Sequence, residues 1–392
     1  MRRIRYYIFL RDVAFLAITG FGGPQVHLAR FTETFVKKRN YLSEEELLEL
    51  NSLCQILPGP TSTQTITAIA FKIGGATLAY LTLLIWILPA VSIMMLLGII
   101  ISYINAKDLS LSFTRFIQPV AIGFIAYAAY TINMKVIRTK IAAVLTVAAV
   151  MITFFSESPF LPPILIILGG AATSFRYKEY PIQEKEKLKI DWRNFILWAG
   201  VFLLAVFLGR VTHLLPIRLF ENFYRNGSLV YGGGQVLVPL LYTEFVEYKK
   251  YLTSSEFLSG YAIAQVAPGP VFSFSSYVGV LSMRNYGTSG QIIGGIASTL
   301  GIFLPGLFLC FFIIRFWNQF KKYRLVKASL EGITAVSSGL VIAAAISLFE
   351  PMDKNIPNII ALCVTFMALV FTKIPSPILV VLAFIAGFIF PG

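Results

Sequence analysis

Long apolar runs recur along the whole chain and alternate with short polar and basic loops. The clearest runs are 76–103, 113–134, 195–208, 287–316 and 378–390. Most of them are long enough to cross the roughly 30 Å hydrocarbon layer of a bilayer. No stretch typical of a soluble domain interrupts them. The pattern therefore predicts an all-α integral membrane protein that crosses the membrane many times.

Composition and charge support this prediction and exclude other classes. Hydrophobic residues make up 57% of the 392 residues and charged residues 13%, with a net charge of +14. The basic residues cluster in short loops, as the positive-inside rule expects of a membrane protein, so we expect a lipid bilayer and no nucleic acid as partner. Cys54, Cys310 and Cys363 form no metal-ligand spacing, and we predict neither a disulfide nor a metal or other cofactor. The basic N-terminal segment, interrupted by Arg11 and Asp12, is expected to be a retained first helix.

The two halves of the chain repeat one another. "GGPQV" at 22 corresponds to "GGGQV" at 232, "YLSEEELL" at 41 to "YLTSSEFL" at 251, and "CQILPGP" at 54 to "AQVAPGP" at 264. Over the 39 positions 22–60, an offset of 210 gives 14 identical residues without a gap. Further on the offset drifts, because "LP" at 88 corresponds to "LPG" at 304. We expect a first repeat at 1–177, a cytoplasmic loop and linker helix at 178–214, and a second repeat at 215–392.

The basic loops indicate how the repeats are oriented. The loops at 135–140, 176–193 and 315–327 are expected on the cytoplasmic side, and the acidic loops at 156–160 and 350–355 outside. This arrangement requires that a helix over 191–214 inverts the second repeat, which is a frequent plan of secondary transporters. The basic residues at 37–39 disagree unless the segments around Gly22 and Pro58 re-enter. Both about 11 spans with re-entrant pieces and about 13 spans remain open.

Pro-Gly-Pro interrupts a helical pattern in each repeat. Residues 44–57 have helical spacing, Pro58-Gly59-Pro60 ends that helix, and a new helix is expected to begin directly after it. The N–H groups at such a start, together with the hydroxyls that follow, form a site suited to an anion. A plain kink, with hydroxyls bonded back to carbonyls, is the alternative. Because the break occurs twice, and a Gly-rich break accompanies it both times, we favour an enclosed polar cavity for a small oxyanion.

The candidate substrate-binding residues are the members of these four breaks and the donors beside them. They are Gly22, Gly23, Gln25, Gln55, Pro58, Gly59, Pro60, Thr61, Ser62 and Thr63 in the first repeat, and Gly232, Gly233, Gly234, Gln235, Gln265, Pro268, Gly269, Pro270, Ser273 and Ser275 in the second.

Ionisable residues near the breaks are candidates for coupling or for attracting charge, because charges in apolar segments are costly and often functional. They are His27, Arg30, Glu33, Lys72 and Glu244. For Arg30 and Lys72 the alternative is a snorkelling residue, and for Glu33 and Glu244 a solvated helix face. Glu46 and Glu256 follow Ser43 and Thr253 by three residues, and we interpret both pairs as capping boxes. No catalytic motif is found, so an enzyme is not expected.

The motifs "FGGPQVHLARF", "LNSLCQILPGPTSTQ", "YGGGQVLVPLL", "AQVAPGPVFSFSSYVG" and "FLPG" resemble those of the chromate ion transporters, in the long two-domain form of that family. The resemblance covers nearly the whole chain. It implies export of chromate across the bacterial cytoplasmic membrane, coupled to the proton gradient, with sulfate as a competing, exchanged or alternative substrate. An anion channel and a sulfate-type oxyanion permease on the same fold remain alternatives. A homodimer is one open option for its assembly.

Overall fold

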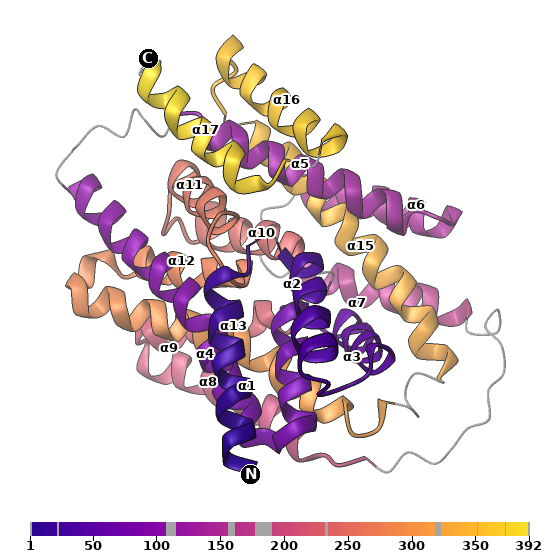
Figure 1. Ribbon diagram of the computed structural model, residues 1–392. Coiled ribbons are helices and arrows are strands. Elements are labelled where there is room, and N and C mark those ends of the chain that lie inside the picture. Colours follow the sequence, from indigo (N-terminus) through magenta and orange to yellow (C-terminus); the bar gives the residue numbers. More distant parts are fainter. Residues whose placement is uncertain are drawn as a thin grey trace. The chain divides into compact units, whose positions relative to one another are not determined.

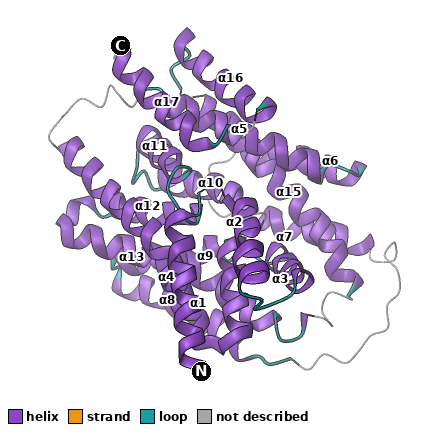
Figure 2. Cartoon of the chain, in the orientation of Figure 1, coloured by secondary structure: helices purple, strands orange, loops and turns teal. Residues whose placement is uncertain are grey.

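The structure of the protein is a computed structural model that describes residues 2–21, 23–106, 115–155, 161–176, 190–231, 234–317, 323–350, 352–372 and 374–390. Within these ranges every regular element is helical (Figure 2). The prediction of an all-α protein is confirmed. The chain folds into two compact units, one formed by 1–103, 189–233 and 264–317 and the other by 104–188, 234–263 and 318–392. Both halves of the sequence contribute to each unit, and the predicted repeat boundaries stay a prediction.

The first unit contains both Pro-Gly-Pro turns. Its elements are α1 (Arg2–Thr19), α2 (Gly23–Phe31), the π-helix η1 (Thr32–Lys38), α3 (Glu44–Ile56), α4 (Thr61–Ala106), α8 (Arg193–Thr212), α9 (Leu215–Gly227), the 3₁₀ turn η5 (Val271–Ser273), α12 (Phe274–Ser282), the 3₁₀ turn η6 (Arg284–Tyr286) and α13 (Gly287–Ile313), labelled in part in Figure 1. Helices lie where the first helix and the helix over 191–214 are expected, as α1 and α8, and the linking role of α8 stays a prediction. In α4 the backbone leaves the helical region at Gly75, where φ is +74°, so the segment 61–74 is a short helix of its own.

Helix α13 lies in the core of the first unit and packs against α8, α9 and α12. Small residues permit this packing. A Cβ on Gly301 of α13 would lie 2.7 Å from the Phe220 carbonyl oxygen of α9, and one on Gly279 of α12 would strike the Gly294 carbonyl oxygen. Close approach at small residues is the usual way in which membrane helices associate, because lipid offers no hydrophobic drive between helices.

The second unit is built around α15 (Arg324–Phe349), which packs against α5 (Ile117–Val136), α6 (Lys140–Phe154), α7 (Leu161–Ser174) and α10 (Gly234–Tyr242). It also contains the π-helix η4 (Thr243–Tyr248), α11 (Ser254–Ala264), α16 (Ile356–Phe371) and α17 (Ser376–Ile389).

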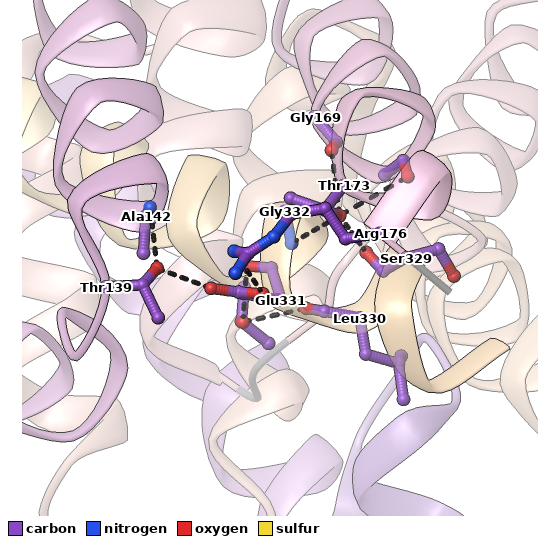
Figure 3. A network of polar contacts seen from close by, with 11 residues as sticks. Thr139, Ala142, Gly169, Thr173, Arg176, Ser329, Leu330, Glu331 and Gly332 are labelled. Atoms are coloured by element: carbon purple, nitrogen blue, oxygen red, sulfur yellow. Dashed lines mark hydrogen bonds and ion pairs between the residues drawn. The ribbon is translucent and has the colours of Figure 1, made fainter. Parts of the chain in front are cut away.

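Polar contacts join α15 to its neighbours at one end of this packing. Glu331 accepts a hydrogen bond from the Thr139 hydroxyl at 2.5 Å and lies 3.5 Å from Arg176 (Figure 3). The next residue, Gly332, donates its N–H to the Thr173 hydroxyl of α7 at 3.0 Å. Glu331 is therefore held in a structural network between three helices.

Among the described residues, five helices are long and apolar enough to cross a membrane: Thr61–Ile104, which includes the break at Gly75, Ile117–Met134, Arg193–Thr212, Arg284–Ile313 and Lys327–Phe349. Five shorter apolar helices accompany them among the described residues. On α8 the side chains of Leu203, Leu204 and Phe207 are exposed, as expected of a helix that faces lipid. The protein is a multi-pass membrane protein. The number of spans and the inversion of the repeats stay predictions.

Candidate substrate site at two Pro-Gly-Pro turns

The first Pro-Gly-Pro turn separates two helices, as predicted. Helix α3 begins with the predicted capping box, in which Ser43 Oγ accepts from Glu46 N–H and Glu46 accepts from Ser43 N–H. It ends at Ile56, Leu57 is extended, and Gly59 takes a φ of +115°. Helix α4 begins directly after Pro60, at Thr61. A positive φ favours glycine, so the sequence places glycine where the chain reverses.

The second turn has the same backbone with a different continuation. Thr253 and Glu256 form the predicted capping box at the start of α11. Gly269 has a φ of +101°, close to that of Gly59, and Pro270 is extended. The chain then makes the 3₁₀ turn η5 before α12 begins at Phe274. The duplication seen in the amino-acid sequence is therefore also present in the backbone conformation.

Each Pro-Gly-Pro turn is bound to the other repeat. The Gly59 N–H donates to the Val230 carbonyl oxygen at 2.8 Å, and the Gly269 N–H donates to the Gly20 carbonyl oxygen at 3.0 Å. These two bonds are equivalent, because both donors and both acceptors are related by the offset of 210. Gly20 and Val230 each lie two residues before a Gly-Gly break. Each Pro-Gly-Pro turn is thus bound to the residue of the other repeat that precedes the Gly-Gly motif by two positions.

A second contact between the repeats lies behind each turn. A Cβ on Gly59 would lie 3.2 Å from the Cα atom of Gly306 in α13, and one on Gly269 would lie 3.1 Å from the Cβ atom of Ala90 in α4. Ala90 and Gly306 follow the prolines that the sequence comparison paired as "LP" and "LPG". Each turn therefore packs against the long helix of the other repeat.

The start of α4 presents donors without partners within the helix. Its first internal backbone bond runs from Gln64 N–H to the Pro60 carbonyl oxygen at 2.9 Å, so the N–H groups of 61–63 precede the helical ladder. Ser62 is buried, and within the described ranges its hydroxyl makes no hydrogen bond. Thr63 Oγ1 accepts from Trp86 Nε1 at 3.2 Å. The positive end of a helix with these donors is suited to an oxyanion.

The corresponding start after Gly269 is less uniform. Ser273 N–H bonds to the Pro270 carbonyl oxygen at 3.0 Å, and the buried Ser273 hydroxyl makes no hydrogen bond in the described part of the chain. Ser275 and Ser276 instead donate to the carbonyl oxygens of Phe272 and Ser273, at 2.8 and 2.7 Å. Their hydroxyl protons are thus used locally. Ser62 and Ser273 are thus two buried hydroxyls, one in each repeat, that remain for a ligand.

Trp86 links the two turns. Its indole N–H donates to Thr63, three residues after the first turn, and its carbonyl oxygen lies 3.9 Å from where a Cβ on Gly269 would be. Its ring also meets His27 edge-on, with centroids 5.1 Å apart. No pattern in the sequence pointed to Trp86, because it lies within an apolar run. Both Pro-Gly-Pro turns therefore belong to one core.

The other candidates take varied positions. Gln55 is exposed and Gln265 partly buried. Gly22, Gly232 and Gly233 lie outside the described residues. Gly23 and Gly234 begin α2 and α10, and Gln25 and Gln235 occupy helical positions just after them. Gly234 and Gln235 belong to the second unit, as does Glu244.

The charged candidates differ in their surroundings. His27 is buried; its Nε2 lies 3.0 Å from the Gly20 carbonyl oxygen, and its Nδ1 has no partner among the described residues. Glu33 is exposed and Arg30 half-buried. Lys72 pairs with Glu46 at 2.5 Å on the surface, and Glu244 forms a buried pair with Lys249 at 2.9 Å. His27 contacts Gly20, whose carbonyl oxygen also accepts from the second Pro-Gly-Pro turn.

Comparisons with known proteins agree with this architecture. A family model described as "Chromate transporter" matches residues 9–175 and again 217–388, once for each half. A probable chromate transport protein of Synechococcus elongatus is 27% identical, covering 96% of this chain and 93% of the relative. A chromate transport protein of Cupriavidus metallidurans is 24% identical, covering 95% and 90%. An uncharacterized transporter of Methanocaldococcus jannaschii is 25% identical, covering 95% and 92%. No solved structure matches.

Proposed function

Since this chain belongs to the chromate transporter family, we propose that it is a secondary transporter that moves chromate out of the cell across the cytoplasmic membrane. The observation that supports this most is the pair of equivalent hydrogen bonds from Gly59 and Gly269, which brings two helix starts into one core. The family is one of transporters and not of enzymes, and the sequence contains no catalytic motif.

The donors at the two starts suit a tetrahedral oxyanion. Chromate carries its negative charge on four oxygens, each able to accept hydrogen bonds from N–H and O–H groups. Ser62 and Ser273, with the free N–H groups beside them, are the proposed first contacts. Sulfate has the same shape and charge, and donors alone would separate the two anions weakly. We therefore include sulfate as a competing or exchanged anion.

Outward movement agrees with the electrical driving force. An inside-negative membrane potential favours the exit of an anion by about 2.3 kcal/mol per charge for each 100 mV. We assign coupling to the proton gradient to His27, whose side chain contacts Gly20 and Trp86. An unperturbed histidine side chain changes charge near neutral pH, and the unpartnered Nδ1 of His27 is the atom that would take up the proton.

Flux into sealed vesicles tests the proposal. Purified protein would be reconstituted into liposomes and selected for inverted orientation, and the uptake of radiolabelled chromate would be measured with and without an imposed proton gradient. We expect uptake above that of protein-free liposomes, increased by the gradient and decreased by external sulfate. Uptake equal to that of protein-free liposomes would exclude chromate transport. Chromate uptake that is the same with and without the proton gradient would instead indicate an anion channel.

A further inference from the structure

Gln64 joins the first Pro-Gly-Pro turn to the second repeat. It lies in the first turn of α4 with 1% of its surface exposed. Its side-chain Nε2 donates to the Pro58 carbonyl oxygen at 2.7 Å and to the Gly306 carbonyl oxygen at 3.0 Å. The carboxamide thus folds back over the N-terminal end of the helix, onto the Pro-Gly-Pro turn that directly precedes residues 61–63.

These two contacts determine which way the carboxamide faces. Both neighbours are carbonyl oxygens, which only accept, so the amide nitrogen must face them and spends both of its protons there. The amide oxygen Oε1 then faces elsewhere. It is fully buried and has no hydrogen-bond partner among the described residues. Buried acceptors without a partner are rare, and a ligand or a bound water is one way to satisfy this one.

The chemistry of that oxygen differs from the rest of the site. The N–H groups of 61–63 and the Ser62 hydroxyl can donate hydrogen bonds. Gln64 Oε1 is an amide oxygen without a proton, so it can only accept them. An anion oxygen without a proton would be repelled by Gln64 Oε1, because both oxygens carry lone pairs and neither has a proton to donate. An anion that keeps one proton would donate it there and accept from the donors with its other oxygens.

We propose that Gln64 Oε1 accepts a hydrogen bond from a singly protonated tetrahedral oxyanion, so that the site selects hydrogen chromate over sulfate. The inference rests on the proposed function and specifies the protonation state of its substrate. Hydrogen chromate loses its proton near neutral pH, hydrogen phosphate and hydrogen arsenate lose theirs only in alkali, and sulfate holds none except in strong acid. Shape and size are similar throughout the series, so protonation, with the net charge that follows from it, is the main variable.

Equilibrium competition tests this on the whole purified protein in detergent. Radiolabelled chromate would be displaced by arsenate, phosphate, sulfate or molybdate, first at slightly acidic and then at slightly alkaline pH. We expect arsenate and phosphate to compete on the order of 10-fold or more better than sulfate and molybdate. Chromate affinity should fall as pH rises, while phosphate affinity should not.

The variant Gln64→Met keeps the length of the side chain and removes the acceptor. We expect its sulfate-to-chromate affinity ratio to move toward one, and Ser52→Ala, on an exposed face of α3, to leave that ratio unchanged. If Gln64→Met does not fold, the competition of the four anions for the unaltered protein still tests the inference. Equal binding of sulfate and chromate, or chromate binding that does not change with pH, would overturn the inference and point to a bound water at Oε1. Absence of chromate binding at every pH would instead overturn the proposed function.

Discussion

Gly59 donates its N–H to the carbonyl oxygen of Val230 at 2.8 Å, although the two residues belong to different repeats. The equivalent bond from Gly269 to Gly20 makes the arrangement reciprocal. A duplicated chain in which each copy folded on itself would not show this exchange. Neither half is therefore expected to complete a Pro-Gly-Pro site alone.

Substituting Gly59 by alanine should destabilise the protein. The alanine backbone would have to adopt a φ of +115°, and its Cβ would lie 3.0 Å from Gln64 Nε2 and 3.2 Å from the Gly306 Cα atom. We expect a loss of about 1 to 3 kcal/mol in the free energy of unfolding, seen as a lower unfolding midpoint in detergent. Gly200→Ala is the matched control, because nothing lies within 4 Å of its Cβ position. Equal midpoints for the two variants would contradict the packing described at the turn.

Cys54 and Cys310 offer a chemical test of the contact between repeats. Their sulfur atoms lie 4.0 Å apart, both are buried, and they come from α3 and α13. A disulfide needs sulfurs about 2.05 Å apart, which is within reach of a rotamer change. We expect iodine, which enters bilayers, to join the two thiols, as found by mass spectrometry of proteolytic peptides. The exposed Cys363 should stay unpaired with either of them. Recovery of both buried cysteines in thiol form after oxidation would show that the helices are further apart.

Lys72 should not be needed for transport. It lies 11 residues beyond the start of α4, about 16 Å along a helix, and it is paired with Glu46. We expect Lys72→Gln to keep the chromate flux within about twofold of the unaltered rate, since an exposed pair contributes less than about 1 kcal/mol. A loss of flux comparable to that of a Pro-Gly-Pro variant would show that Lys72 takes part in transport.

The same pair has a consequence for stability in acid. The hydrogen bond from Lys72, with a second from the Ser43 N–H, lowers the pKa of Glu46 below its usual value. Its contribution to stability is therefore present above the unfolded pKa of about 4.3 and lost as pH falls through the lower folded value. Lys72→Gln should flatten the decline of the unfolding midpoint in this range, whereas Lys72→Arg should preserve it. Identical slopes for both variants would show that the pair adds nothing.

His27→Gln should separate binding from coupling. A glutamine amide nitrogen can replace Nε2 as the donor to Gly20, but it takes up no proton near neutral pH. We expect the variant to bind chromate with little change and its vesicle flux to lose its response to the proton gradient. A flux that still rises with the gradient would assign coupling to another residue.

The sequence predicted local features well, and missed those that depend on distant contacts. The Pro-Gly-Pro breaks, both capping boxes and the helix after residue 191 follow from nearest neighbours along the chain, and the structure has them. The π-helices η1 and η4 occupy equivalent positions that no pattern indicated. Asn40 and Lys250, different residues at equivalent positions after them, share a left-handed backbone. The backbone conformation at these two positions is the same although the residue types differ.

The site itself was predicted only in part. Repetition pointed to the turns, but it could not show that each turn binds the other repeat, because Gly59 and Val230 are not aligned with one another. It also favoured residues present in both copies. Gln64 and Trp86, which connect the turns to α13 and to each other, correspond to no like residue in the second repeat, so a comparison of the copies does not by itself single them out.

The most direct test of the account is the affinity of the purified protein for chromate, measured by isothermal titration calorimetry on two double variants. Ser62→Ala with Ser273→Ala removes the two buried hydroxyls that make no hydrogen bond within the described residues. Ser275→Ala with Ser276→Ala removes two neighbouring hydroxyls that already donate to backbone carbonyls. Each lost hydrogen bond to an anion should weaken binding by about 10-fold or more, so we predict at least about 100-fold for the first pair and little change for the second. Equal affinity of the two double variants would contradict an oxyanion site at the Pro-Gly-Pro turns.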